Sequence, residues 1–139
     1  MIRKFIKNDI DVIMQIWLET NIKAHNFIEE NYWKNNFEQV KLLLPQSELY
    51  VYIDDVIKGF IGLNDTYIEG IFVLEKEQSK GIGKQLLDYV KILKNELTLN
   101  VYKKNKQAID FYKRENFKII SEDFDQATQE EEYCMKYIK

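Results

Sequence analysis

One segment near the middle of the chain constrains the fold more than any other. Between residues 67 and 93 the sequence changes from a strand pattern that ends at Val73 to a polar connection containing Gly81 and Gly83. A helix pattern follows, with apolar residues at helical spacing (Ile82, Leu86, Leu87, Val90 and Leu93). A strand that leads into an amphipathic helix through a short loop is part of a β–α–β crossover, so we expect a sheet with a helix packed against it.

The other periodic segments extend this unit in both directions. Alternating or apolar runs predict strands at 2–6, 49–53, 56–63, 67–74, 97–101, 117–121 and 133–138. Helical spacing predicts a helix that Asp9 opens as N-cap, with Val12, Ile13, Ile16 and Trp17 on one face. Further helices are expected over about 27–44, ended by Pro45, and over 81–93 and 105–115. This order predicts a mixed sheet with helices on both faces.

The composition is that of one globular domain. Of 139 residues, 45% are hydrophobic and 31% are charged, a mixture that excludes disordered and fibrous classes. The length suits a single core, so we expect one domain over residues 1–139. The net charge of −3 lacks the basic field of a nucleic-acid-binding protein, and we expect no nucleic acid partner.

Cysteine use and apolar run lengths bear on location. Cys134 is the only cysteine, so no internal disulfide forms, no zinc-ligand spacing is present, and we expect no metal. The first residues lack the apolar stretch of a signal peptide, and no apolar run approaches the ~18 residues that cross a bilayer. We therefore expect a cytoplasmic protein without a membrane partner.

The charge is unevenly distributed along the chain. Residues 76–118 contain 11 Lys and Arg against 5 Asp and Glu, whereas the rest contains 9 against 18. Residues 121–132 hold six acids and no base between two apolar segments, which predicts a loop or hairpin. Two surfaces of opposite charge are expected.

The loop that opens the helix at residue 81 is suited to an anion. The first turn of a helix leaves unpaired N–H groups and the positive end of the dipole, and glycine lets a phosphate approach the backbone. Two common nucleotide motifs nevertheless fail. A dinucleotide fingerprint needs a small residue where Leu86 stands, and a P-loop needs Ser or Thr where Gln85 follows Lys84.

A different pattern fits both halves of this region. Residues 78–83 read Gln-x-x-Gly-x-Gly after a strand that ends at Val73, and this resembles the acetyl-coenzyme A loop of the GNAT superfamily of N-acyltransferases. Residues 105–117 resemble the family's N-x-x-A-x-x-F-Y-x-x-x-G-F segment, with Asn116 in place of glycine. Asn replaces Gly readily in the left-handed conformation that ends a helix. Residues 24–27 are similar to a small bacterial YjaB-type subgroup.

The resemblance implies a fold and a cofactor site. The fold is the GNAT fold, a mixed α/β (α+β) architecture with a mostly antiparallel sheet of six to seven strands and about four helices on both faces. The strand ending at Val73 then diverges from the strand at 97–101, and the pantetheine of acetyl-CoA inserts between them. The residues implied to bind acetyl-CoA are Ile71, Phe72, Val73, Gln78, Ser79, Lys80, Gly81, Ile82, Gly83, Lys84, Asn105, Ala108 and Tyr112. Lys80, Lys84, Lys104 and Lys106 are expected to add positive charge there.

Three residues are candidates for the chemistry. The family position of Tyr112 implies a general acid, since a phenol with pKa ~10 stays protonated at neutral pH and donates to a departing thiolate. Glu69, a charge on a central strand, is our candidate proton acceptor. His25 is the only histidine, and its ordinary pKa of ~6.5 suits a base or a contact to the acceptor. The resemblance implies that the wall of the acceptor site lies in the same region, which also contains Trp17, Asn21, Tyr32 and Trp33. Asn105 is equally well explained as an N-cap of the helix it begins.

The sequence therefore predicts an acetyl-CoA-dependent N-acetyltransferase acting by direct transfer to a primary amine. The acceptor is a small molecule or a peptide, and the acidic remainder of the chain favours a cationic one. A monomer or a homodimer is expected. Two alternatives stay open at this stage: a non-catalytic acyl-CoA-binding module, which needs the glycine loop but not Tyr112 or Glu69, and an α/β nucleotide-binding protein.

Overall fold

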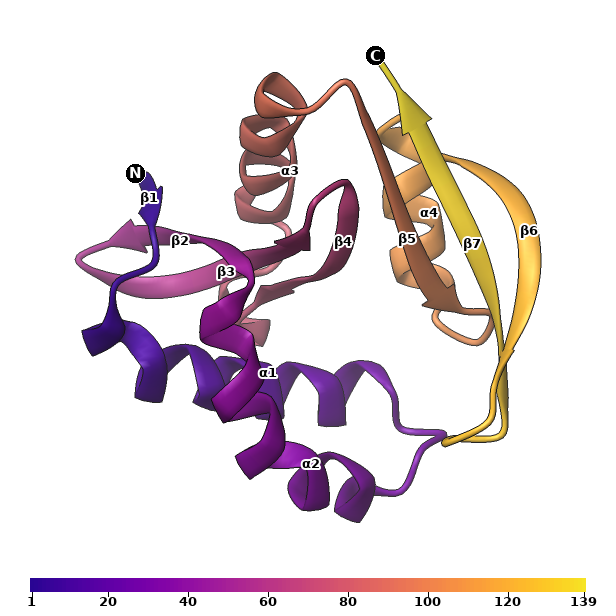
Figure 1. Cartoon of the computed structure of the whole chain (residues 1–139), viewed down its shortest axis with the longest axis horizontal. Coiled ribbons are helices and arrows are strands. Elements are labelled where there is room, and N and C mark those ends of the chain that lie inside the picture. The colour runs from indigo at the N-terminus through magenta and orange to yellow at the C-terminus, as the bar shows by residue number, and fades with distance from the viewer.

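Seven strands form one sheet in the order β1-β2-β3-β4-β5-β7-β6 (Figure 1). The computed structural model describes residues 1–139. The strands are β1 (Ile2–Lys4), β2 (Glu48–Asp54), β3 (Val56–Asn64), β4 (Tyr67–Val73), β5 (Glu96–Tyr102), β6 (Lys118–Asp125) and β7 (Glu130–Ile138). All neighbours are antiparallel except β4 and β5. The expected mixed and mostly antiparallel sheet is confirmed.

Four helices cover the two faces of this sheet. They are α1 (Ile10–Ala24), α2 (Glu30–Leu43), α3 (Ile82–Leu93) and α4 (Lys106–Arg114). Buried side chains of α1 and α2 form one core with β2 and β3, and those of α3 and α4 form a second core with β3, β4, β5 and β7. Because the two cores lie on opposite faces, each helix buries its apolar stripe against the sheet.

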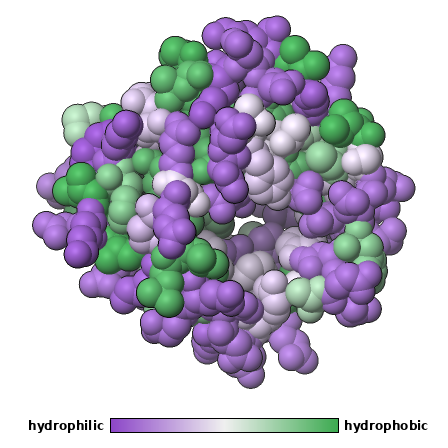
Figure 2. Space-filling view, viewed as in Figure 1, coloured by the Kyte–Doolittle hydropathy of each residue, from purple (hydrophilic) through white to green (hydrophobic).

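The sheet opens between β4 and β5. Their register contains one pair, Tyr67 with Thr98, and from there toward Val73 the strands separate (Figure 1). The space-filling view is hollowed near its centre, where Figure 1 shows these two strands moving apart (Figure 2). The divergence implied by the family resemblance is therefore present, with its closed end at Tyr67.

Details of the first helix differ from the sequence expectation. Asp9 stands at the N-cap position of α1 but makes no capping bond to it. Its carboxylate instead accepts two hydrogen bonds from Arg3, at 2.8 and 3.0 Å, and one from the Ile6 N–H at 2.9 Å. Arg3 holds the pKa of this carboxyl below its usual range. Val12, expected on the buried face, is 45% exposed, because the helix turns that position toward solvent.

The acidic segment forms a hairpin, as one of the two sequence alternatives proposed. Residues 121–125 belong to β6 and residues 130–132 to β7, and four residues connect the strands. Asn116 has a φ of +72° at the end of α4, which confirms the left-handed role expected for it. No helix of the structure combines the length and apolar character needed to cross a bilayer.

Candidate active site

The glycine loop ends in a helix terminus that nothing in the chain caps. Gly81 precedes α3 with a φ of +84°, and no side chain bonds the first turn. The N–H groups of Ile82, Gly83 and Lys84 have no acceptor within the protein. Space beside Gly81 is open, since a Cβ added there meets no atom within 4 Å. A phosphate can therefore approach these three donors along the axis of α3.

Three of the four lysines expected to add positive charge are engaged in ion pairs within the chain, whereas the fourth, Lys106, is exposed and forms none. Lys80 lies 3.0 Å from Glu77, and Lys84 lies 3.2 Å from Asp88 and 3.1 Å from Glu115. Lys104 pairs with Glu130 at 3.2 Å. These contacts reduce the positive charge that the sequence assigned to the loop, so the unpaired backbone donors of α3 are the groups best placed to meet an anion there.

The edge of β4 that faces the opening offers unpaired backbone groups. After the Tyr67–Thr98 pair no residue of β4 is paired with β5, so the stretch that includes Ile71, Phe72 and Val73 borders the gap. Gln78 folds back on this strand end, where its amide Nε2 donates to the Val73 carbonyl at 2.9 Å. An extended chain lying in the gap would complete the sheet by strand addition. The opening and the free donors of α3 together fit the shape of acetyl-CoA.

Tyr112 is buried on the α4 side of the opening. Its ring is 8% exposed and lies between Phe111 and Phe117, at centroid distances of 5.3 and 5.5 Å. Burial, reinforced by the nearby Tyr67 phenol, raises the pKa of Tyr112. The hydroxyl is thus protonated at neutral pH. Tyr112 shares its core with Ile68 of β4 and Leu99 of β5, which lie beside the Tyr67–Thr98 pair at the closed end of the gap.

Glu69 is the extra residue of a bulge in β4. Gly62 of β3 opposes Gly70, and Leu63 opposes Ile68, so Glu69 has no partner on β3. A bulge re-aims the side chain it inserts, and the Glu69 side chain is exposed. This explains how a charge is tolerated on a central strand.

His25 belongs to an aromatic cluster in the connection between α1 and α2. Its ring stacks on Trp33 at 5.3 Å and meets the edges of Phe27 and Tyr102 at 5.8 and 5.1 Å. Burial lowers the pKa of His25 to about 4. The imidazole is therefore neutral at pH 7 rather than poised near its ordinary pKa. Its Nδ1 is buried without a partner.

Asn105 connects this aromatic cluster to α4. Its Oδ1 accepts from the Ala108 N–H at 3.2 Å, which caps the helix, and its Nδ2 lies 3.4 Å from His25 Nε2. Both ends of the amide are therefore occupied inside the protein. Of the two roles that the sequence left open for Asn105, the structure shows the cap. Ala108 takes part through its backbone.

The expected wall for the acceptor is only partly accessible. The sequence placed Trp17 and Asn21 near His25 and Trp33, but Trp17 is 8% and Asn21 5% exposed, both within the α1 and α2 packing. Asn21 donates to the Trp17 carbonyl at 2.9 Å. Helical spacing alone could not separate residues facing the core from residues facing an acceptor.

Several polar side chains that sequence reasoning missed lie on the face of β5 and β7 that points away from α3 and α4, called the open face below. Asn100 of β5 donates to Glu132 of β7 at 3.2 Å, and Tyr67 is close enough for the charge of Glu132 to raise its pKa. Tyr102 donates to Asp125 at 2.7 Å. Only the alternation of polar residues along β5 and β7 signalled these positions, and their pairing depends on strand register.

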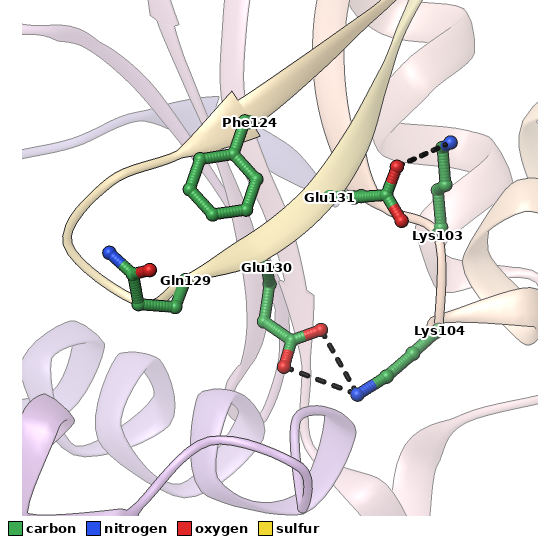
Figure 3. A pocket seen from close by; sticks show the side chains of 6 residues that line it. All are labelled: Lys103, Lys104, Phe124, Gln129, Glu130 and Glu131. Atoms are coloured by element: carbon green, nitrogen blue, oxygen red, sulfur yellow. Dashed lines mark hydrogen bonds and ion pairs between the residues drawn. The ribbon is translucent and has the colours of Figure 1, made fainter.

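The tip of the hairpin is tied to the end of β5 (Figure 3). Lys103 pairs with Glu131 at 3.1 Å and Lys104 with Glu130 at 3.2 Å. Together with Phe124 and Gln129 these residues line a shallow pocket. The two ion pairs hold the hairpin tip against the residues that follow β5. Lys104 also lies 5.5 Å from the ring of Phe27 in the α1–α2 connection.

The sequence matches a known family over the region that forms this site. The model of the acetyltransferase (GNAT) family matches residues 10–117, which include the glycine loop, the opening and α4. The chain belongs to the GNAT acetyltransferase family. This confirms both the resemblance seen in the sequence and the class of enzyme it implied.

Individual relatives agree with that assignment. Peptidyl-lysine N-acetyltransferase YiaC of Escherichia coli is 31% identical over 140 residues, which cover 99% of this chain and 96% of YiaC. The solution structure of apo-form YjaB from Escherichia coli has a TM-score of 0.88 at 24% identity, covering 99% of this chain and 96% of YjaB. A structure of yncA from Salmonella typhimurium, solved with its cofactor acetyl-CoA, has a TM-score of 0.67 at 16% identity, covering 99% and 92%. The last two likenesses show the shared fold.

Proposed function

We propose that this GNAT acetyltransferase transfers the acetyl group of acetyl-CoA to the ε-amine of a lysine in a peptide or protein. The observation that carries the proposal is the arrangement along β4. Free backbone donors lie beyond its Val73 end, and a buried, protonated Tyr112 lies near the closed end of the gap at Tyr67. A ligand with phosphates at the first position and a thioester at the second spans the opening.

The chain's own residues have separate tasks in this scheme. The N–H groups of Ile82, Gly83 and Lys84 hold the pyrophosphate, with Gln78, Ser79, Lys80 and Gly81 around it. Backbone groups of Ile71, Phe72 and Val73 bind the pantetheine and orient the thioester. Acetyl-CoA supplies an activated acyl group. The Tyr112 hydroxyl protonates the departing sulfur. This transfer is uphill, because the phenol is a weaker acid than the thiol (~10 against ~8.5), and it is completed when the tyrosinate takes up the proton that the new amide nitrogen loses.

A lysine acceptor suits the electrostatics of the open face. Glu69, Glu132, Asp123 and Asp125 lie on or beside this face, and a carboxylate-lined face attracts a cationic side chain. The relative YiaC is named a peptidyl-lysine N-acetyltransferase, which supports the same acceptor. His25 is engaged by Asn105, and we assign it to anchoring the acceptor side rather than to proton transfer.

The first experiment separates this function from non-catalytic CoA binding and from nucleotide binding. We expect CoA and acetyl-CoA, but neither ATP nor NAD, to raise the melting temperature; at ~100 times the dissociation constant the gain is ~2.7 kcal/mol. Acetylation of lysine peptides by the wild-type chain is then measured against peptides carrying Arg or acetylated Lys. Stabilisation by CoA without turnover of any amine would favour the binding module instead.

Replacement of Tyr112 by Phe tests the acid. Loss of a proton donor lowers kcat by about 100-fold, because general acid catalysis contributes ~10² to 10⁴. The stabilisation by acetyl-CoA stays unchanged, since the ring and its packing remain. Tyr89→Phe, which removes a hydroxyl from a ring packed on Tyr50, is the matched control. An unchanged kcat in Tyr112→Phe would remove the assigned role.

A further inference from the structure

Glu132 of β7 lies on the opposite face of the sheet from Tyr112. Tyr133 and Met135, its neighbours on β7, pack into the α3 and α4 core, so Glu132 and Cys134 project the other way. On β5 the buried residues Leu99 and Val101 likewise alternate with Asn100 and Tyr102. Figure 1 shows α4 behind this half of the sheet and no helix in front of it.

Glu132 is held in a defined place by its neighbours. Asn100 Nδ2 donates to its Oε1 at 3.2 Å. The two residues are diagonal neighbours on adjacent strands, because Asn100 is paired with Cys134 and Tyr102 with Glu132. Glu132 is half-buried, whereas Asn100 and Tyr67 are exposed. A carboxylate fixed by an amide beside an accessible surface is placed to receive a ligand from solvent.

Tyr67 links this carboxylate to the closed end of the opening. Ile68, next to Tyr67 on β4, belongs to the α3 and α4 core, so Tyr67 projects to the face that carries Glu132. Burial and the charge of Glu132 raise the pKa of Tyr67. Tyr67 is the first residue of β4 and the only one that is paired with β5. The face that carries Asn100 and Glu132 therefore borders the closed end of the gap, and Tyr112 lies on the opposite face.

We propose that Glu132, oriented by Asn100, is the proton acceptor for the substrate ammonium. This rests on the proposed function. One proton leaves the lysine ammonium for the Glu132 carboxylate. The freed nitrogen lone pair forms the C–N bond at the thioester carbonyl, and the C–S bond breaks. Tyr112 protonates the sulfur, the second nitrogen proton restores the Tyr112 hydroxyl through solvent, and Glu132 releases its proton to water.

The charged surroundings of Glu132 agree with this role. Burial, and the negative charges of Asp125 and Asp123 on β6, raise its pKa, while the hydrogen bond from Asn100 opposes them. Tyr67 on β4 and Tyr102 on β5 face it as neutral phenols, and Cys134 lies beside it on β7. A carboxylate with a raised pKa holds a captured proton better than an ordinary one. Glu69, exposed on its bulge, is the competing acceptor that the sequence suggested.

The experiment compares pH profiles of kcat/KM for a lysine peptide in the wild type, Glu132→Gln, Glu69→Gln and Glu131→Gln. Glutamine keeps the shape of Glu132 and accepts the Asn100 hydrogen bond, and melting curves check that it folds. We expect Glu132→Gln to lose about 100-fold in kcat/KM at pH 7. Its activity then rises with pH toward the lysine pKa of ~10.4, because free amine must form in solution. Glu131→Gln, an exposed neighbour paired with Lys103, keeps the wild-type profile.

Each result decides between the proposals. A large loss with rescue at high pH in Glu132→Gln, and unchanged stabilisation by acetyl-CoA, supports Glu132. The same behaviour in Glu69→Gln, with a normal profile in Glu132→Gln, overturns it and makes Glu69 the acceptor. If Glu132→Gln only raises KM for the peptide at every pH, the residue binds the acceptor and the proton-transfer role is wrong. A wild-type chain that binds acetyl-CoA but acetylates no amine removes the proposed function and this inference together.

Discussion

Two helices of the second core, α3 and α4, begin in opposite ways. The first turn of α3 has free N–H groups, a left-handed glycine before it and open space beside it. The first turn of α4 is capped by Asn105, whose Oδ1 accepts from the Ala108 N–H and whose Nδ2 lies 3.4 Å from His25 Nε2. Each pattern contains an Asn or a Gly at the position where a helix starts, yet only the first turn of α3 has no side chain bonded to it.

The difference shows what a binding terminus requires. A helix that satisfies its own first N–H groups gains about 1 kcal/mol of stability but offers nothing to an anion. Leaving them free forgoes that stabilisation and keeps a preorganised anion site. The α3 terminus is therefore suited to an anion, in line with the proposed cofactor site, and the α4 terminus connects the aromatic cluster to the helix that carries Tyr112.

The largest expected effect comes from closing the α3 terminus with a charge. Gly83→Asp places a carboxylate in the first turn, where it interacts favourably with the dipole but repels the pyrophosphate. We expect acetyl-CoA affinity to fall roughly 100-fold, about 2.7 kcal/mol, since a charged hydrogen bond is worth up to ~3 kcal/mol. Titration calorimetry measures the affinity, and thermal unfolding without ligand shows equal or higher stability.

Gly83→Ala is the control for this change. An added Cβ meets Phe111 at 3.7 Å, an ordinary contact, so alanine fits and raises stability by up to ~1 kcal/mol through helix propensity. Its acetyl-CoA affinity stays within a few-fold of the wild type. Equal affinity in the Ala and Asp variants would show that the α3 terminus does not hold the phosphates.

The next largest effect is the pH dependence of the free energy of unfolding, which we expect from His25 beside the start of α4. The pKa of His25 is about 4 in the folded chain against ~6.5 when unfolded. His25 therefore lowers stability progressively as the pH falls from about 6.5 to 4, because the unfolded chain takes up a proton that the folded chain does not. After a discount for partial exposure the loss is about 2 kcal/mol.

Urea unfolding of the wild type and His25→Phe between pH 4 and 8 isolates this contribution. Phe keeps the packing on Trp33 and has no titrating group, so we expect the variant to lose less stability than the wild type over this range. Carboxylates contribute equally to both chains and cancel in the difference. Parallel stability curves would mean that His25 is solvated enough to keep its ordinary pKa.

The smallest effect is opening the α4 terminus. Asn105→Ala removes the cap and is expected to destabilise the fold by about 1 kcal/mol, a fall of several degrees in melting temperature. Acetyl-CoA affinity changes less than twofold, because the amide is occupied within the chain. Asn105→Asp retains the cap and serves as the control. A large loss of affinity in Asn105→Ala with little loss of stability would restore its role in the cofactor site.

Most of the fold could be predicted from the sequence. Strand alternation and helical spacing located all eleven principal elements, with ends shifted by a few residues, as for α2, which begins at Glu30 rather than near Phe27. The errors were local. Asp9 has the right residue type for an N-cap, but Arg3 approaches from β1 and takes its carboxylate, and no pattern within the helix signals a partner from another strand.

The backbone part of the candidate site could be predicted from the sequence, whereas the partners of its side chains could not. The glycine loop was recognisable because its function depends on backbone conformation, which a short motif specifies. The pairing of Lys80, Lys84 and Lys104 with acids, and the bulge at Glu69, depend on neighbours distant in sequence or on register. The Asn100–Glu132 contact joins residues 32 positions apart, so the sequence offered no reason to consider them together.

The sequence by itself determined the order of elements, the position of the glycine loop and the family, because these follow from local propensity and from motifs of contiguous residues. Only the tertiary structure decided which helix terminus lacks a side-chain cap, that His25 is largely removed from solvent and neutral at pH 7, and that Tyr112 and Glu132 lie on opposite faces of the sheet. These properties depend on solvent exclusion and on the distance between groups brought together by folding. A pKa or an ion pair is set by such surroundings rather than by the residue type.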